Sequence, residues 1–240
     1  MNWFEYKGIN SNRYRNLVVQ ELPPIVKPMM RSEFVYHDGA DGTTIKERGY
    51  DMTLKYVRIG LKNNDDLDYI IAWLTGSGRV TFSNEPTKYY IGTILDQIEF
   101  VKTGRFLTAL IPFECQPYKY LRDETALTFT TAGTYKVYNA GTVTSMPLIT
   151  IYATGEVEFT VNGYEYAVNL NQYYPNCQID SEAMNAYTNL YGDWQIKNVL
   201  FEEGKNYGAP PYPLLNPGEN TITITGTFTS FEILPRSRFI

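Results

Sequence analysis

The sequence has a single histidine among 240 residues, and this scarcity narrows the chemistry available to it. A serine or cysteine nucleophile activated by histidine would have to use His37, in the glycine-containing segment VYHDGADG. Zinc sites need several His and Cys ligands at short spacing, which one His and two distant Cys do not provide. Asp38 and Asp41 lack the alternating ligands and terminal Glu of an EF-hand loop. The segment therefore predicts a hairpin turn, and we expect no metal.

Cysteine is almost as rare, and long apolar runs are missing. Cys115 and Cys177 are too few for a disulfide scaffold, and each lies in a β-like stretch, so two buried free thiols are expected. The opening segment MNWFEYKGINSNRY has no apolar region typical of a secretory signal, and no apolar run approaches the length that crosses a bilayer. We therefore expect no membrane contact, and folding in the cytoplasm where the chain is made.

Basic residues are scarce in the second half of the chain. Residues 1–125 carry 16 Lys or Arg and 16 Asp or Glu, whereas residues 126–240 carry 5 and 10 and account for the whole net charge of −5. A net negative charge argues against nucleic acid as a partner. The uneven distribution indicates two halves with different surfaces.

Catalytic and cofactor motifs are also missing. The segment TGSGRV (75–80) lacks the third glycine of a dinucleotide loop and follows a predicted helix rather than a strand. Glu156 with Glu158, or Glu202 with Glu203, could serve a glycosidase, but such neighbours on a strand or loop usually form a solvated face. We therefore predict no enzymatic activity, no catalytic residue and no cofactor.

Aromatic and β-branched residues are abundant instead. The 21 Tyr and 12 Phe, beside many Thr, Val and Ile, favour a mainly β fold. Strand patterns in the first half lie at 17–22, 50–61, 79–83, 88–101 and 105–115. One amphipathic helix is predicted over 65–75, where four apolar residues share a face: Leu67, Ile70, Ile71 and Leu74.

The residue pattern of the second half indicates a separate domain. Pro, Thr and charged residues interrupt the strand pattern around 117–133, and we place the boundary near 122–126, between domains 1–124 and 125–240. Short strands of alternating polarity then follow, at 148–153, 156–161, 164–170, 216–226 (after a turn) and 227–234. Asn162-Gly163 predicts a two-residue hairpin turn. Short strands separated by turns at this spacing predict a β-sandwich.

Aromatic residues gather in a loop-rich stretch, 172–213. It contains Tyr173, Tyr174, Tyr187, Tyr191, Trp194, Tyr207 and Tyr212. Such side chains fill sandwich cores, anchor protein interfaces and offer faces on which sugars stack. All three interpretations stay open, and five of these residues are candidate interaction residues: Tyr187, Tyr191, Trp194, Tyr207 and Tyr212.

A further aromatic pair ends the segment FSNEPTKYY (82–90), where a polar turn centred on Pro86 runs into Tyr89 and Tyr90. Successive residues of a strand point to opposite faces. We therefore expect one tyrosine in the core and the other on a surface that a neighbouring copy could cover. The segment is predicted to be a connector, with the pair as candidate interaction residues, rather than a catalytic site.

Seven segments, in order along the chain, resemble the phage distal tail protein family of siphovirus-type tails. In the first half they are WFEYKGINS (3–11), RGYDMTLKYVRIGL (48–61), LTGSGRVTFSNEPTKYYIG (74–92) and FECQPYKYL (113–121). In the second half they are NAGTVTSMPLITIYATGEVEFTVNG (139–163), QIDSEAMNAY (178–187) and NPGENTITITGTFTSFEILPRSRFI (216–240). Ser181 departs from the family pattern, where a Cys is expected. The short chain also suggests that the extra arm or carbohydrate-binding insertions of some members are missing.

The resemblance implies a structural protein of a long, non-contractile tail, with a β-barrel-like N-terminal ring domain carrying one helix and a galectin-like C-terminal β-sandwich. Its implied partners are further copies in a homo-hexamer, the tail tube protein, the tail-tip lysin or tail fibre protein, and receptor-binding proteins at the rim. The implied location is the virion tail tip. A ring closes through heterologous contacts, and a first half without net charge suits packing against its own copies. The alternative function is a carbohydrate-binding adhesin that contacts the host cell wall through residues 172–213.

Overall fold

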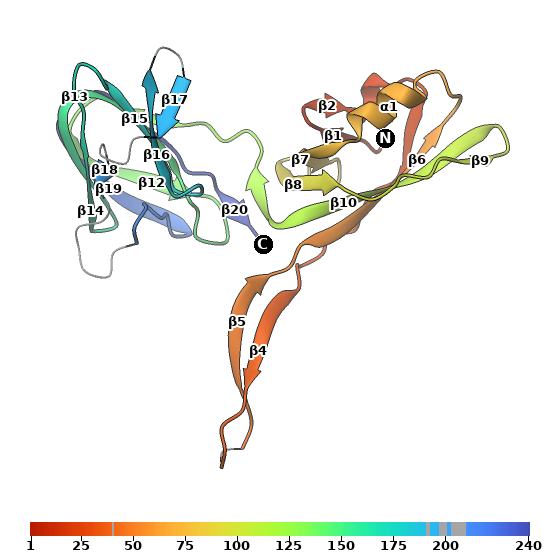
Figure 1. Ribbon diagram of the computed structural model, residues 1–240, viewed down its shortest axis with the longest axis horizontal. Coiled ribbons are helices and arrows are strands. Elements are labelled where there is room, and N and C mark those ends of the chain that lie inside the picture. The colour runs from red at the N-terminus through yellow and green to blue at the C-terminus, as the bar shows by residue number, and fades with distance from the viewer. Residues whose placement is uncertain (40, 191–192, 197–200, 203–209) are drawn as a thin grey trace. The chain divides into compact units, whose positions relative to one another are not determined.

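The computed structural model describes residues 1–39, 41–190, 193–196, 201–202 and 210–240, and the side chains of 1–39, 41–188 and 210–240. The fold is mainly β, as predicted, with one α-helix in these ranges and one sheet curled as a half-barrel (Figure 1). None of the helical segments described has the length and apolar character to cross a bilayer.

The chain forms two compact units, Met1–Arg122 and Asp123–Phe239, each with its own hydrophobic core. That these units correspond to independently folding domains 1–124 and 125–240 stays a prediction.

The first unit is built on an antiparallel sheet with strand order β2-β1-β7-β8-β10-β6-β3, and β9 pairs with β10. A separate two-stranded sheet is formed by β4 and β5. The strands are β1 (Phe4–Tyr6), β2 (Ile9–Asn10), β3 (Leu17–Glu21), β4 (Met30–Val35), β5 (Thr44–Tyr50), β6 (Thr53–Leu61), β7 (Gly76–Phe82), β8 (Lys88–Ile94), β9 (Val101–Thr103) and β10 (Phe106–Leu121). A 3-10 turn, η1 (Ser11–Arg13), follows β2.

The predicted helix is present as α1 (Leu67–Trp73), shorter than the range 65–75. Its core face differs by one residue from the predicted face, because Trp73 is buried whereas Ile71 is 45% exposed. Trp73 stacks on Phe4 with ring centroids 5.2 Å apart, and its indole N–H donates to the carbonyl of Tyr6 over 2.9 Å. These two contacts explain the exchange, since they tie the helix to β1 in the core.

The second unit has strand order β11-β19-β13-β15-β16-β17, with β12 paired to β19, and β14 paired to β13 and β18. The strands are β11 (Leu127–Phe129), β12 (Gly133–Asn139), β13 (Leu148–Val161), β14 (Tyr164–Asn169), β15 (Asn176–Asp180), β16 (Asn185–Leu190), β17 (Asp193–Ile196), β18 (Phe201–Glu202), β19 (Gly218–Leu234) and β20 (Arg238–Phe239). Asn162 and Gly163 both have positive φ, 51° and 87°, and join β13 to β14 in the hairpin turn that the sequence predicts.

The long strands β13 and β19 correct the sequence prediction, which divided each of them into two. They stay paired through a bulge, where residues 154–156 of β13 lie between the pairs Ala153–Phe228 and Val157–Gly226. The early half of β13 pairs with β15 and the later half with β14. A bulge bends the strand that contains it. The β13–β19 pair therefore continues through the bend, and its residues on both sides of the bulge contribute to one hydrophobic core.

The two cysteines are free and fully buried, as predicted, Cys115 in the first unit and Cys177 in the second. Burial raises the pKa of both thiols to about 12. Thiolate is the reactive species, so both should resist thiol reagents until their own unit opens.

We predict that Cys115 and Cys177 become reactive at two different urea concentrations, because each unit has its own core. Pulsed alkylation followed by peptide mass spectrometry measures each thiol separately. Simultaneous labelling of both thiols at every urea concentration would contradict independent folding of the two units.

Candidate assembly surfaces

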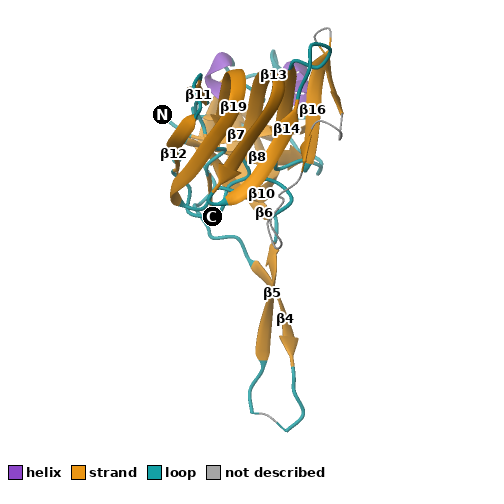
Figure 2. Cartoon of the chain, turned by 90° about the vertical axis from the view of Figure 1, so that its left-hand side faces the viewer, coloured by secondary structure: helices purple, strands orange, loops and turns teal. Residues whose placement is uncertain are grey.

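The β4–β5 hairpin is an isolated two-stranded sheet of the first unit (Figure 2). The turn between its strands is the HDGADG segment, where the sequence predicted a turn, and Gly39 and Gly42 both have positive φ there. That the chain lacks the extra arm or carbohydrate-binding insertions of some family members stays a prediction. An isolated two-stranded hairpin is marginally stable in water, so a partner for it is expected.

The two faces of the hairpin differ in chemistry. Phe34 pairs with Ile45, and these side chains are 55% and 56% exposed. The opposite face carries an ion pair, in which Arg48 Nε donates to Glu33 over 3.0 Å. Further exposed apolar side chains of the hairpin and its base are Ile25, Met29, Met30 and Tyr36. The Phe34–Ile45 pair therefore offers apolar contact area to a partner, with the Ser32–Glu47 pair next to it on the same face, while the opposite face is charged.

A second exposed apolar surface lies on the outer face of the main sheet. Tyr56 of β6 pairs with Pro112 of β10, and Arg58 pairs with Leu110. Together with Asp96, Gln97, Glu99, Val101, Thr108 and Ala109 they line a groove of about 410 Å³, so apolar side chains share this groove with charged and polar ones. Tyr56 and Leu110 are 45% and 44% exposed, which is unusual for large apolar side chains of a central strand pair. We call this surface the β6–β10 groove.

The FSNEPTKYY segment connects β7 to β8, and its two tyrosines point to opposite faces, as the alternation predicts. Tyr89 is half-buried, stacks on Tyr120 at 5.4 Å and lies under the Arg79 guanidinium at 4.6 Å. Tyr90 is only 3% exposed, so its ring belongs to the core and cannot contact a partner. Of the two tyrosines, only Tyr89 is therefore left as a candidate interaction residue, and its surface role stays a prediction.

Tyr90 belongs to a buried polar cluster. Its hydroxyl donates to Glu85 Oε2 over 2.7 Å, and Lys119 Nζ lies 2.8 Å from Glu85 Oε1. Lys55 is 3% exposed and places its ammonium 4.7 Å from the Tyr90 ring centroid. Burial lowers the pKa of Lys55 and raises that of Tyr90. Burial alone would also raise the pKa of Glu85, but the hydrogen bonds from Lys119 and Tyr90 outweigh it and hold that pKa below its ordinary value.

The remaining predicted interaction residues are only partly within the described ranges. Tyr187 of β16 is half-buried, and Tyr212 is half-buried against the core of the second unit. Trp194 lies in β17, but its side chain is outside the described ranges, as are Tyr191 and Tyr207 entirely. The interaction role expected for these five residues stays a prediction.

No group of three or more His, Cys, Asp or Glu in the described part of the chain could hold a metal ion. His37 is exposed beside the hairpin turn. Glu158 and Glu165 line a depression of about 330 Å³ in the second unit, together with three threonines, Phe159 and Tyr166.

Sequence reasoning missed the hairpin as an interaction surface and the buried cluster entirely. The hairpin has a usable signal, because β-forming residues flank the predicted turn on both sides, as in SEFVY and TTIKE. The cluster has none, since Glu85 and Lys119 are 34 residues apart and meet only across the folded sheet.

No protein-family model and no curated protein matches the chain. Among solved structures, it is similar to the SPP1 Dit protein, described as a paradigm of the hub adsorption apparatus in phages that infect Gram-positive bacteria. The TM-score is 0.73 over 100% of both chains, at 19% identity. It is also similar to a chain of the phage P2 baseplate in its activated conformation with Ca, with TM-score 0.54 over 100% of this chain and 98% of that one, at 7% identity.

Both likenesses run through the full length of the chain, so they include the first unit, the hairpin and the second unit together. The resemblance that the seven sequence segments indicated is therefore confirmed for the fold, and the chain has the fold of a phage distal tail protein.

Proposed function

We propose that the chain is a structural distal tail protein that assembles as a homo-hexameric ring at the tip of a long, non-contractile phage tail. In this role it joins the tail tube to the tail-tip lysin or tail fibre protein, offers its rim to receptor-binding proteins, and has no enzymatic activity. The observation that carries the proposal is the full-length fold similarity to the SPP1 Dit hub protein.

The two exposed apolar surfaces of the first unit support cyclic assembly. The hairpin's Phe34–Ile45 face and the β6–β10 groove are different surfaces of one chain. A contact between the hairpin of one copy and the groove of the next is therefore heterologous, and heterologous contacts generate rings when the rotation closes. Covering both surfaces would also remove exposed apolar area that a monomer leaves in water.

Light scattering coupled to size-exclusion chromatography tests this proposal. We expect a particle with six times the 27.6 kDa mass of the chain at high micromolar concentration. Replacing Phe34→Ser together with Ile45→Thr should reduce it to a monomer, because the pair supplies the apolar face of the hairpin.

The matched control is Glu33→Gln with Lys46→Gln, a cross-strand pair on the opposite face of the same hairpin. It should leave the hexamer intact. A wild-type chain that stays monomeric by light scattering and shows no ring in electron micrographs would overturn the proposal.

The alternative function, a carbohydrate-binding adhesin, stays a prediction. It depends on the aromatic stretch 172–213, in which the side chains of Tyr191, Trp194 and Tyr207 lie outside the described ranges. Calorimetry against host wall polysaccharide tests it, with binding lost in Trp194→Ala as the expected result.

A further inference from the structure

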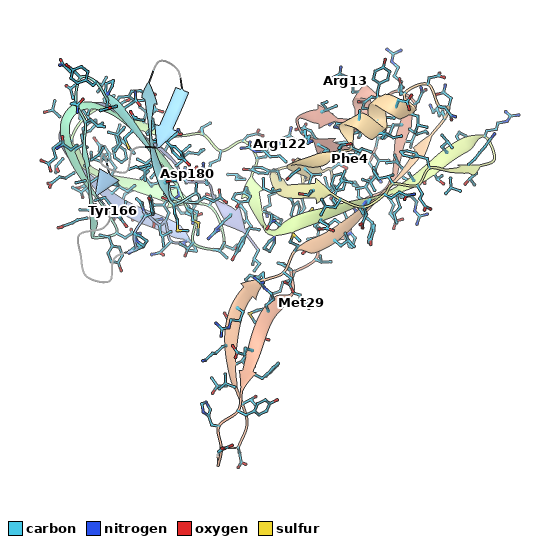
Figure 3. The ribbon with its side chains drawn as sticks, viewed as in Figure 1. Phe4, Arg13, Met29, Arg122, Tyr166 and Asp180 are labelled. Carbon is cyan, nitrogen blue, oxygen red and sulfur yellow. The ribbon has the colours of Figure 1, made fainter. Side chains whose placement is uncertain are left out.

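The base of the β4–β5 hairpin is where its two legs leave the main sheet. The first leg follows β3 and contains Pro23, Pro24 and Pro28, and the second leg enters β6. Met29, labelled in Figure 3, accepts a backbone hydrogen bond of 2.9 Å from Asp51 and so joins the two legs. The Arg31–Asp51 ion pair, at 3.3 Å, and the pairing of Met30 with Tyr50 join the legs further, and the remaining contacts of the base come from the main sheet of the first unit.

The two consecutive prolines limit how the first leg can be held. Proline has no backbone N–H, so Pro23 and Pro24 can only accept hydrogen bonds through their carbonyl groups. The donors must therefore come from elsewhere. Two side chains supply them: Asn84 Nδ2 donates to the Pro23 carbonyl over 2.9 Å, and Lys55 Nζ donates to the Pro24 carbonyl over 3.2 Å.

The two donors that hold the leg lie in different elements of the first unit. Lys55 lies on β6, two residues after the strand begins, and so ties the second leg to the first. Asn84 lies in the FSNEPTKYY connector, far from the hairpin in sequence. Each donor uses a proline carbonyl that the β3–β6 ladder cannot engage, because that ladder ends at the Glu21–Arg58 pair.

The connector itself is fixed at three points. Ser83 exchanges hydrogen bonds with Trp3, since its N–H donates to the Trp3 carbonyl over 2.9 Å and its hydroxyl accepts from the Trp3 N–H over 3.0 Å. Glu85, next to Asn84, is bound by Lys119 and Tyr90 in the buried cluster. The Thr87 carbonyl accepts from the Arg122 N–H over 2.9 Å. Asn84 is thus a donor on a rigid support rather than on a free loop.

We propose that Asn84 and Lys55 are positioning residues that hold the proline leg and thereby fix the direction in which the β4–β5 hairpin leaves the first unit. We call the two donors and the two proline carbonyls the root clamp. Its use in assembly rests on the proposed function, because a fixed hairpin meets the groove of the next copy at a lower entropic cost than a swinging one. The clamp itself depends only on contacts within one chain.

A clamp that positions the hairpin differs measurably from a contact that merely stabilises the unit. Lys55→Met removes the donor to Pro24 and also removes a buried ammonium, which is costly to desolvate. Relief of that desolvation cost offsets the lost attraction to Glu85, so the thermal unfolding midpoint should stay close to that of the parent. A hairpin that loosens while the unit stays equally stable would therefore be the signature of the clamp.

The experiment measures a distance within a dilute, monomeric chain. Nitroxide labels at Ser32→Cys on the hairpin and Ser77→Cys on β7 report the hairpin direction by double electron–electron resonance, and both sites are exposed. The buried thiols of Cys115 and Cys177 should stay unlabelled. We expect a narrow distance distribution in the parent, and a distribution about twice as wide, or a second population, in Asn84→Ala and in Lys55→Met, since each loses one donor of the clamp.

The matched control is Asn63→Ala, another exposed asparagine of the first unit whose Nδ2 bonds a neighbouring carboxylate and no hairpin residue. It should leave the distribution narrow. Narrow, unshifted distributions in both clamp variants would overturn the clamp.

Assembly is then measured separately on unlabelled chains. The apparent dissociation constant should rise about tenfold in each clamp variant, equivalent to about 1.4 kcal/mol. Wider distributions with unchanged assembly would overturn the positioning role. A parent chain that never assembles would overturn the proposed hexamer, while the distance measurement would still decide whether the clamp exists.

Discussion

Replacing Glu85 with glutamine is expected to lower the free energy of unfolding of the first unit by about 3–5 kcal/mol, the usual cost of breaking a buried ion pair. The side chains of Glu85 and Lys119 are 12% and 9% exposed, so water screens this pair weakly. Lys55 is also buried, next to the same tyrosine ring, and it feels the charge of Glu85 as well. One carboxylate therefore faces two buried ammonium groups and, in addition, the half-buried Lys88, and its loss leaves the two buried cations without a counter-charge.

The same charge count predicts an asymmetry between the two partners of the pair. Lys119→Met leaves Glu85 with Lys55 and with the hydroxyl of Tyr90, so the cluster becomes neutral rather than doubly positive. It should cost less than half as much as Glu85→Gln. The control Glu33→Gln makes the same chemical change in an exposed ion pair with Arg48 and should stay within about 0.5 kcal/mol of the parent.

Urea titrations followed by the exposure of Cys115 report this unit selectively, because that thiol lies in its core. Equal losses in Glu85→Gln and Lys119→Met would mean that Lys55 does not share the carboxylate, and that the charge count is wrong.

The difference in unfolding free energy between the parent and Glu85→Gln should change with pH in a definite direction. The pKa of Glu85 in the folded chain lies below its ordinary value. The stability that its charge provides is therefore fully present above the unfolded carboxyl pKa of about 4.3 and is lost as the pH falls through the folded pKa. The gap in unfolding free energy between the parent and Glu85→Gln should be constant near neutral pH and shrink below about pH 4. A gap that widens on acidification would contradict this assignment.

The parts of this molecule that could be predicted from its sequence are those decided by neighbouring residues. Asn162-Gly163 is one example, since both residues adopt positive φ and the turn needs nothing from the rest of the chain. The opposite orientation of Tyr89 and Tyr90 is another, because it follows from the geometry of a single strand. The helix was located for the same reason, although its tertiary contacts decided that Trp73 rather than Ile71 faces the core.

The candidate assembly surfaces could not be predicted in this way, because they lie on strand faces that this chain leaves exposed. An alternating apolar pattern appears when one face of a strand is buried in its own chain. From Met30 to Val35 no residue is buried, so the pattern is weak even though Phe34 and Ile45 share a face. The root clamp is hidden for a further reason, because Asn84 and Pro23 are 61 residues apart and the contact is a side chain on a carbonyl.

Two glycines of the second unit lie where the sequence prediction divided long strands. Gly155 lies between the predicted strands 148–153 and 156–161, and Gly226 ends the predicted segment 216–226. In the structure they lie together in the bulge of the continuous β13–β19 pair, Gly226 opposite Val157. The backbone approaches most closely there: a Cβ on Gly226 would lie 2.5 Å from the carbonyl oxygen of Glu156. Glycine thus permits the bend within the strand pair rather than ending a strand.

This interpretation predicts that Gly226→Ala destabilises the second unit by about 4 kcal/mol. Its φ of 95° is unfavourable for alanine and should cost about 2 kcal/mol. The clash with Glu156 should add about 2 kcal/mol more, as overpacking does elsewhere. Exposure of Cys177 during urea titration measures the effect, since that thiol lies in the same core.

The matched control separates the two contributions. Gly163 has a φ of 87°, but a Cβ there would meet nothing within 4 Å. Gly163→Ala should therefore cost only the backbone part, about 2 kcal/mol. If both variants lose the same stability, the close approach to Glu156 contributes nothing and β13 can move away from β19 without cost. The bulge would then be a soft joint, and Gly226 would be needed only for its backbone conformation.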